Sequence, residues 1–264
     1  MDRPRKLRLD QLLVERGLAA TRGRAQAMLL AGQVRVGAGD AARRDIRPGA
    51  QVDADVPISV AAGPRYVSRG GDKLAGALDA FGIDPAGRTC LDVGASTGGF
   101  TDCLLQRGAR RVYALDVGRG QLAGSLRADA RVVSMERTHA ARLDPASGDP
   151  LGLPEPVGLA VADVSFISLT RVLRGIAAQA APGADIVPLV KPQFELGPKE
   201  VPRGVVRDPE ARRRAVARVR EHARGLGLEV LAEAESALPG PAGNHELFLH
   251  LRVPLTIGPR EPQP

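Results

Sequence analysis

Three carboxylates and one lysine stand at or near the ends of apolar runs that are typical of buried strands. Asp92, Asp116 and Asp163 close or nearly close three of these runs, and Lys191 closes a fourth. Strand ends of this kind meet at the carboxyl edge of a parallel sheet, where such folds bind their ligands. We therefore expect the three acids and the lysine to share one site.

Lysine is rare in this chain, which makes its positions informative. Only four of the 37 Lys and Arg residues are lysines: Lys6, Lys73, Lys191 and Lys199. Arginine keeps its proton at physiological pH, whereas a lysine amine can lose it and act as a base. Lys191 at a strand end therefore favours a functional role. A helix is predicted from Lys73 to about Phe81, with Asp72 at its N-terminus. Lys73 then stands in its first turn, where a cation opposes the helix dipole, so it is either a solvated surface lysine or a functional one.

A loop of small residues after Asp92 indicates a ligand site. It lies between a predicted strand, 89–93, and a helix that begins at Phe100. Its glycine spacing fits neither the dinucleotide motif nor the phosphate-binding loop. An acid at the next strand end, Asp116, could accept hydrogen bonds from ribose hydroxyls, so the pair suits a nucleoside without a pyrophosphate, such as S-adenosylmethionine (SAM). The alternative is an ordinary turn whose glycines serve packing. The residues predicted to bind this cofactor are Asp92, Gly94, Ala95, Ser96, Thr97, Gly98, Phe100, Asp116 and Asp163.

A doubly wound sheet is needed to bring these residues together, and seven apolar runs supply its strands. They cover residues 89–93, 111–116, 132–135, 158–163, 186–191, 229–235 and 247–253, with helical segments between most of them. This pattern predicts an α/β protein with a Rossmann-like SAM-dependent methyltransferase fold, in which helices cover both faces of a mostly parallel sheet. Residues 136–140 are a candidate for contact with adenine, with His139 itself as a bystander.

The first 65 residues form a distinct basic segment, with 12 Lys and Arg against 7 Asp and Glu. Two helices are predicted over 9–17 and 22–31, the second capped by Thr21. Short strands over 33–36 and near 51 follow them. The order R-L-D-x-x-L-x-x-x-G, T-R-x-x-A and G-x-V-x-V resembles the RNA-binding domain named after ribosomal protein S4. We therefore predict an S4-like domain over 1–60, a linker over 61–65 and a catalytic domain over 66–264. The predicted phosphate-binding arginines are Arg3, Arg5, Arg8, Arg22, Arg24 and Arg35.

Composition limits the class of protein. A hydrophobic content of 44% supports a sizeable core, and a net charge of +7 with a pI near 10.2 favours a polyanionic partner. Cys90 and Cys103 lack the spacing of metal ligands and are expected to be small buried side chains. Neither a signal peptide nor a membrane-spanning run is present in the sequence. We expect a cytoplasmic monomer without a metal or membrane attachment.

Five further stretches, in order through the chain, complete a resemblance to a known family. They are Ser68-Arg-Gly-Gly-Asp-Lys-Leu, Asp92-Val-Gly-Ala-Ser-Thr-Gly-Gly-Phe, Ala162-Asp-Val-Ser-Phe-Ile-Ser, Leu189-Val-Lys-Pro-Gln-Phe-Glu and Gly240-Pro-Ala-Gly-Asn-His-Glu. Residues 66–253 resemble FtsJ-like RNA 2′-O-methyltransferases, and the whole chain resembles the TlyA family of rRNA cytidine-2′-O-methyltransferases, once described as hemolysins. The resemblance implies a catalytic tetrad of Lys73, Asp163, Lys191 and Glu246. His139 departs from the asparagine expected between Thr138 and Ala140.

The implied reaction needs a base, because a ribose 2′-hydroxyl is a poor nucleophile. An amine with an ordinary pKa of ~10.4 is protonated at pH 7, and partial desolvation or a second cation favours its neutral form. Our hypothesis is that Lys191 is the base and that Lys73 tunes it or holds a phosphate, while Asp163 and Glu246 orient the two amines. The resemblance implies cytidines near the ribosomal subunit interface, in 23S rRNA and in some cases 16S rRNA.

Three alternatives belong to other functional classes. The first is a non-catalytic rRNA-binding or assembly factor that retains the fold, against which the complete tetrad argues. The second is a hemolysin-like membrane-active protein, which no hydrophobic or strongly amphipathic segment supports. The third is pseudouridine synthesis, which some proteins with S4-like domains perform, although the sequence contains no sign of its catalytic domain.

Overall fold

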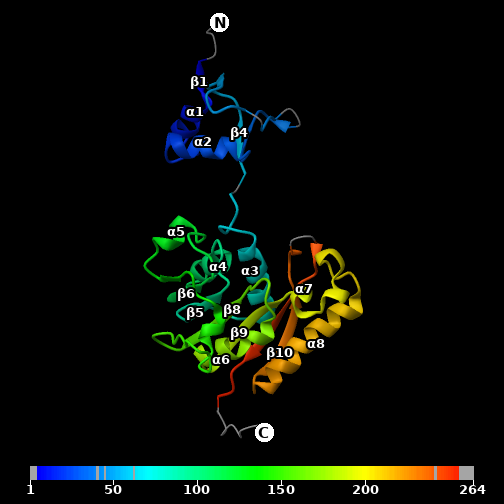
Figure 1. Ribbon diagram of the computed structural model, residues 1–264. Coiled ribbons are helices and arrows are strands. Elements are labelled where there is room, and N and C mark those ends of the chain that lie inside the picture. The colour runs from blue at the N-terminus through cyan, green and yellow to red at the C-terminus, as the bar shows by residue number, and fades with distance from the viewer. Residues whose placement is uncertain (1–4, 40–41, 45, 62, 241–242, 256–264) are drawn as a thin grey trace. The chain divides into compact units, whose positions relative to one another are not determined.

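Separate hydrophobic cores divide the chain into two units, Met1–Arg65 and Tyr66–Pro264 (Figure 1). The structure is a computed structural model that describes residues 5–39, 42–44, 46–61, 63–240 and 243–255. Among the helices of these residues, none has the length and apolar character needed to cross a bilayer.

A seven-stranded sheet lies at the centre of the second unit, in the order β10-β11-β9-β8-β5-β6-β7. Strands β5 to β9 pair in parallel, whereas β11 is antiparallel to both of its neighbours. The predicted α/β class and mostly parallel sheet are therefore confirmed. The strands are β5 (Thr89–Val93), β6 (Arg111–Leu115), β7 (Val132–Met135), β8 (Val157–Ala162), β9 (Ala180–Val190), β10 (Glu229–Glu235) and β11 (Leu247–Arg252).

Helices cover both faces of this sheet, as predicted, and alternate residues of one strand enter different cores. Leu91 and Val93 of β5 share a core with residues of α6 (Leu173–Gln179) and α8 (Pro209–Gly225). Cys90 of the same strand packs in the core formed with α3 (Gly70–Phe81) and α4 (Gly99–Gln106). Burial on both faces explains why the parallel strands are continuously apolar. Cys90 and Cys103 are both small buried side chains, as expected.

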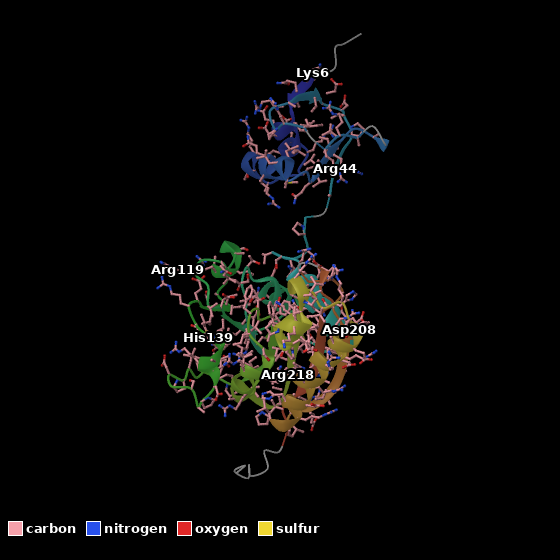
Figure 2. The ribbon with its side chains drawn as sticks, turned by 45° about the vertical axis from the view of Figure 1, so that its right-hand side comes forward. Lys6, Arg44, Arg119, His139, Asp208 and Arg218 are labelled. Carbon is pink, nitrogen blue, oxygen red and sulfur yellow. The ribbon has the colours of Figure 1, made fainter. Side chains whose placement is uncertain are left out.

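The remaining helical segments are short. They are α5 (Gly124–Arg127), α7 (Pro192–Glu195) and the 3-10 helices Ala140–Leu143, Leu169–Arg171, Pro198–Glu200 and Pro202–Gly204. Pro209 opens α8 as predicted, and the Asp208 carboxylate accepts hydrogen bonds from the backbone N–H groups of Glu210 and Ala211 (Figure 2). Such a cap satisfies donors that the helix itself leaves unpaired.

The described residues of the first unit form two helices and four short strands. Strand β1 (Lys6–Arg8) pairs with β3 (Gln51–Asp53), and β2 (Val34–Val36) pairs with β4 (Ile58–Val60). Helices α1 (Leu9–Glu15) and α2 (Arg22–Leu30) contribute Leu9, Leu13, Ala25 and Met28 to its core. The Thr21 hydroxyl caps α2, as predicted, by accepting a hydrogen bond from the Arg24 backbone N–H. Strands β1 and β4 were not predicted.

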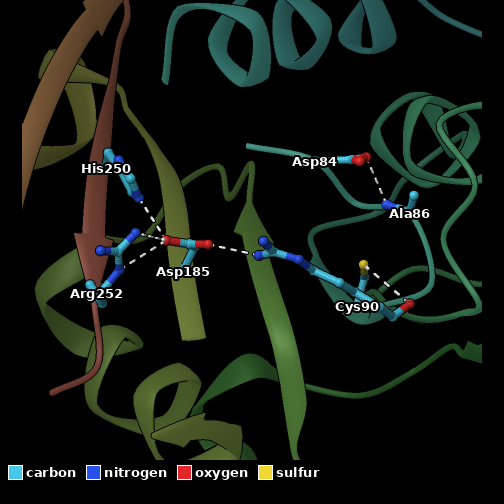
Figure 3. A network of polar contacts seen from close by, with 7 residues as sticks. Asp84, Ala86, Cys90, Asp185, His250 and Arg252 are labelled. Carbon is cyan, nitrogen blue, oxygen red and sulfur yellow. Dashed lines mark hydrogen bonds and ion pairs between the residues drawn. The ribbon is translucent and has the colours of Figure 1, made fainter. Parts of the chain in front are cut away.

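A buried ionic network ties strands β9 and β11 to the start of β5, near the edge of the sheet opposite the carboxyl ends of the parallel strands. The Asp185 carboxylate lies 2.8 Å from His250 Nε2, accepts a hydrogen bond of 3.0 Å from Arg252 Nη2, and accepts one of 2.7 Å from Arg88 (Figure 3). Burial opposes ionisation of Asp185, but the hydrogen bonds from His250, Arg88 and Arg252 outweigh it and hold the pKa of this carboxyl below its ordinary value.

This network predicts an acid-sensitive contribution to stability. A carboxyl whose pKa is lower in the folded state stabilises the fold above its unfolded-state pKa of about 3.9, and the stabilisation is lost as the pH falls through the folded value. We expect Asp185→Asn to lower the free energy of unfolding by about 1–3 kcal/mol at pH 7, because buried donors lose a charged acceptor. The difference from the wild type should shrink below pH 4.

Near-ultraviolet circular dichroism during urea unfolding measures this effect in the second unit alone, since the chain has no Trp and only two Tyr, Tyr66 and Tyr113. A difference that stays constant from pH 7 to pH 3 would show that the Asp185 charge does not contribute.

Candidate active site

Three elements of the sheet bring the predicted tetrad to one edge. Asp163 directly follows β8 and Lys191 directly follows β9, so both lie at the carboxyl edge of the parallel strands. Glu246 directly precedes β11, which runs in the opposite direction, so its start lies at the same edge. Lys73 reaches this edge from the first turn of α3. Topology alone therefore gathers four residues that span more than half of the chain.

The tetrad forms two ion pairs. Lys191 Nζ lies 2.6 Å from Asp163 Oδ1 and donates a hydrogen bond of 2.9 Å to Ser165 Oγ. Lys73 Nζ lies 2.5 Å from Glu246 Oε2. Both lysines are only 8% exposed, so Lys73 is not the solvated surface residue that the sequence left as one alternative. Each carboxylate thus lies against one amine, and the structure brings the four predicted residues together as two pairs.

Helix α3 starts earlier than predicted, and this places Lys73. The helix begins at Gly70 rather than after Asp72, so Asp72 lies within the first turn. A Cβ atom on Gly71 would lie 2.2 Å from the Tyr66 ring, so only glycine allows the helix to start against this buried tyrosine. The early start turns Lys73 inward, toward Glu246.

Both lysines line one cavity of about 350 Å³ together with the small-residue loop. The loop residues Gly94, Ala95, Ser96, Thr97, Gly99 and Phe100 line it, as do Ser68, Arg69, Asp163 and Pro239. Glu246 does not line this cavity. It lines a separate groove along α8 and contacts Lys73 from there. The cavity therefore presents two amines and one carboxylate to a ligand.

A second, larger cavity of about 920 Å³ adjoins the first, because Gly94, Ser96 and Asp163 line both. Its other walls come from the ends of β6 and β8 and from the segment after β7: Asp116, Val117, Gln121, Thr138, His139, Ala140, Ala141, Val164, Ser165, Phe166, Ile167 and Arg171. Phe166 is 91% exposed and its ring centroid lies 5.2 Å from that of Phe194. Cavities of these volumes hold ligands of nucleoside size.

Residues 66–253 match the FtsJ-like methyltransferase family. The chain belongs to this family. A protein from Mycobacterium tuberculosis named 16S/23S rRNA (cytidine-2'-O)-methyltransferase TlyA is 49% identical over 252 residues, which cover 94% of this chain and 91% of that protein. This similarity confirms the predicted membership of the TlyA family.

Solved structures agree with this assignment. A protein from Streptococcus thermophilus described as a hemolysin superposes with a TM-score of 0.69 and 38% identity, over 95% of this chain and 89% of its own. A structure from Listeria monocytogenes described as a SAM-dependent methyltransferase has a TM-score of 0.52 and 12% identity, over 70% of this chain and 98% of its own, and shares the fold alone.

In this methyltransferase, two of the predicted cofactor residues line neither cavity. Asp92 is fully buried beneath the loop, where its Oδ2 accepts a hydrogen bond of 2.7 Å from Thr101 Oγ1. Burial raises the pKa of Asp92 to about 7. Gly98 packs against α5, since a Cβ there would lie 2.3 Å from a methyl group of Leu126. Asp92 and Gly98 therefore support the loop from behind.

The remaining loop residues border the cavities, and Asp116 fixes their position. Asp116 accepts hydrogen bonds from the backbone N–H groups of Ser96, at 2.8 Å, and Gly118, at 2.6 Å. A Cβ on Gly94 would lie 2.5 Å from the Asp163 backbone oxygen. The loop can approach Asp163 only because Gly94 lacks a side chain.

The segment after β7 contributes more to the methyltransferase than the sequence indicated. Thr138, His139 and Ala140 line the larger cavity, and His139 Nδ1 accepts a hydrogen bond of 3.1 Å from the Ala141 backbone N–H. His139 is therefore a helix cap at the cavity wall rather than a bystander. Ser165, Gln121 and Arg171 also line the cavity although they were not predicted, and only Ser165 belongs to a stretch that the sequence marked.

The structure separates the six predicted RNA-binding arginines into different groups. Arg8 and Arg22 both donate hydrogen bonds, of 3.1 and 2.9 Å, to the buried Asp10 carboxylate. The hydrogen bonds from Arg8 lead the interactions that hold the pKa of Asp10 well below its usual range. Arg5, Arg24 and Arg35 are exposed. Arg3 lies outside the described residues.

Proposed function

We propose that this protein transfers the methyl group of SAM to the ribose 2′-hydroxyl of cytidines in ribosomal RNA, 23S and in some cases 16S. One observation carries this proposal: two buried lysines, each paired with a carboxylate, line the same cavity as the small-residue loop. The relative from Mycobacterium tuberculosis bears the name of this activity. We further propose that the protein works in the cytoplasm as a monomer.

The two adjoining cavities suit the parts of SAM. We propose that Gly94, Ala95, Ser96 and Thr97 hold its amino-acid portion beside Asp163, in the smaller cavity. The missing Cβ at Gly94 lets the loop lie against the Asp163 backbone, so that the loop and Asp163 border the same cavity. Asp116 borders the larger cavity and has acceptor lone pairs left for ribose hydroxyls, while Thr138 to Ala140 flank the adenine. SAM supplies an electrophilic methyl group.

The lysines would act on the nucleophile. In this proposal the Lys191 amine accepts the proton of the 2′-hydroxyl, while Asp163 and Ser165 fix the direction of Nζ. Lys73, held by Glu246, would place its charge beside the adjacent phosphate. Correct alignment of the oxygen and the methyl carbon contributes the rest of the acceleration.

The S4-like assignment of residues 1–60, with 61–65 as linker, stays part of the proposal. Its support is the order of motifs, the excess of basic residues and the exposed positions of Arg5, Arg24 and Arg35. Lys6 and Arg44 add further cations to this unit (Figure 2). Exposed cations bind RNA phosphates and recognise shape rather than sequence.

The reaction can be tested with tritiated SAM and ribosomal subunits from a strain that lacks the corresponding gene. We expect label in rRNA, and reverse-transcription stops at low nucleotide concentration should map it to cytidine 2′-oxygens. Asp116→Ala should abolish the label because SAM binding, measured by calorimetry, is lost. Label on a base or in protein, or SAM affinity unchanged in Asp116→Ala, would contradict the corresponding part of the proposal.

A further inference from the structure

Glu195, the last residue of α7, has a buried carboxyl group that joins two segments of the active site. It is 2% exposed, although glutamate is seldom buried in proteins. Its Oε2 accepts a hydrogen bond of 2.5 Å from Ser168 Oγ, and its Oε1 accepts one of 2.8 Å from the Leu169 backbone N–H. Burial raises the pKa of this carboxyl, so the two hydrogen bonds only partly offset its desolvation. Burial of a carboxyl group without full compensation costs free energy, so the burial of Glu195 points to a role for this residue.

The two joined segments are the ones that carry the Lys191–Asp163 pair. Residues 163–169 follow β8 and include Asp163, the ion-pair partner of Lys191, and Ser165, which accepts a hydrogen bond from the Lys191 amine. Residues 191–195 follow β9 and include Lys191 itself. The segments thus meet at the Lys191 amine and again at the Glu195 carboxylate.

Aromatic contacts lie between these two meeting points. The rings of Phe166 and Phe194 have centroids 5.2 Å apart, and Lys191 Nζ lies 5.9 Å from the Phe194 centroid. Phe166 itself has φ of +64°, a backbone conformation that L-residues rarely adopt without support. The segment after β8 therefore needs a fixed anchor to keep this shape, and Glu195 bonds to its far end.

Glu195 is anchored in turn by the long helix α8. Its backbone oxygen accepts a hydrogen bond of 2.7 Å from Arg218 Nη1, whose side chain reaches it from α8 (Figure 2 labels Arg218). Helix α8 packs in one of the main cores of the unit through Val219 and Ala223. Glu195 thus connects α8, through its backbone oxygen, to the segment that forms one wall of the larger cavity, through its side chain.

We propose that Glu195 is a positioning residue that holds residues 163–169 in place, and so presents Asp163 and Ser165 to Lys191 and completes the wall of the cofactor cavity. The effect on catalysis rests on the proposed function. The effect on SAM affinity depends only on the cofactor site.

Two substitutions separate the hydrogen bonds of Glu195 from its charge. Glu195→Gln keeps an oxygen that can accept the hydrogen bond from the Leu169 backbone N–H. Its new NH2 group can donate a hydrogen bond to Ser168 Oγ. Ser168 Oγ is able to accept this bond, because its own hydroxyl hydrogen can turn toward Thr170 Oγ1, 2.7 Å away. Glu195→Ala removes both bonds. Asp185→Asn is the matched control, since it alters another buried, hydrogen-bonded carboxylate near the opposite edge of the sheet.

We expect Glu195→Ala to weaken SAM binding by about 10-fold in calorimetry and to lower kcat by about 10²-fold at saturating SAM, because small misplacements near reacting groups are costly. Amide hydrogen exchange in residues 163–169 should become faster. Glu195→Gln should remain within about 3-fold of the wild type in all three measurements. Asp185→Asn should lower thermal stability without changing any of them.

Wild-type SAM affinity, kcat and amide exchange in Glu195→Ala would overturn the positioning role, and so would equal losses in Asp185→Asn. The proposed substrate would be rejected if the wild-type protein left rRNA unmethylated. The positioning role would still hold in that case if Glu195→Ala bound SAM more weakly than the wild type and exchanged the amide hydrogens of residues 163–169 faster.

Discussion

Replacing Lys191 with alanine is expected to lower the single-turnover rate of methyl transfer by about 10²–10⁴-fold, the usual scale for loss of a general base. Lys191→Arg should cost about as much, because a guanidinium keeps the charge but cannot give up its proton. SAM affinity should survive both changes, since Lys191 holds no part of the cofactor in the proposed arrangement. Transfer of labelled methyl groups over a pH series measures the rates, and calorimetry measures SAM binding.

Lys199→Arg provides the matched control, because Lys199 is exposed in a 3-10 helix eight residues further along the chain. It should keep the wild-type rate and pH profile. If Lys191 only neutralises a phosphate, Lys191→Arg should retain much of the activity. An active Lys191→Arg variant with the wild-type pH profile would therefore remove Lys191 from the role of base.

Loss of the exposed cations of the first unit is expected to produce the second large effect, on RNA affinity. Substituting Arg5, Arg24 and Arg35 together by alanine should weaken binding to rRNA. The dependence of binding on salt should also become shallower, by about one unit of log–log slope for each phosphate that the variant no longer neutralises. All three side chains are exposed. The fold should survive, because none of them belongs to the core or to the Asp10 cluster.

A control variant removes the same charge from α8, through Arg213, Arg214 and Arg224. Arg213 and Arg214 already pair with Glu210 and Glu200, so their loss should change RNA binding less. SAM affinity should be unchanged in both triple variants. Filter binding at several salt concentrations measures the slopes. Equal effects from the two variants would show that net charge, rather than the first unit, determines RNA affinity.

The sequence by itself determined the fold class and the side of the sheet on which the chemistry lies. Asp163 and Lys191 follow apolar runs, and parallel strands all end at one edge, so their proximity could be predicted without coordinates. The small-residue loop and Asp116 were identified for the same reason. These features depend only on residues close together in the chain and on the parallel arrangement of the strands, for which the alternating strand and helix pattern leaves few alternatives.

Tertiary structure decided which of these residues face a ligand and which support the loop. Asp92 stands near the end of the same kind of run as Asp163, yet it lies within β5, buried behind the loop and bonded to Thr101, whereas Asp163 follows β8. The apolar pattern cannot separate the two acids, because it does not show at which residue each strand ends. Arg8 and Arg22 are a similar case, since their common partner, Asp10, is visible only once the first unit is folded.

The longest-range contacts could not be derived from sequence pattern at all. Lys73 and Glu246 are 173 residues apart, and their pairing depends on the early start of α3 against Tyr66 and on the antiparallel entry of β11 between two parallel strands. Only the family resemblance indicated that these two residues act together. Glu195 carried no signal of its own, because a glutamate in a short, Pro-rich segment is ordinarily solvated, and its burial results from the meeting of two strand-end segments with α8.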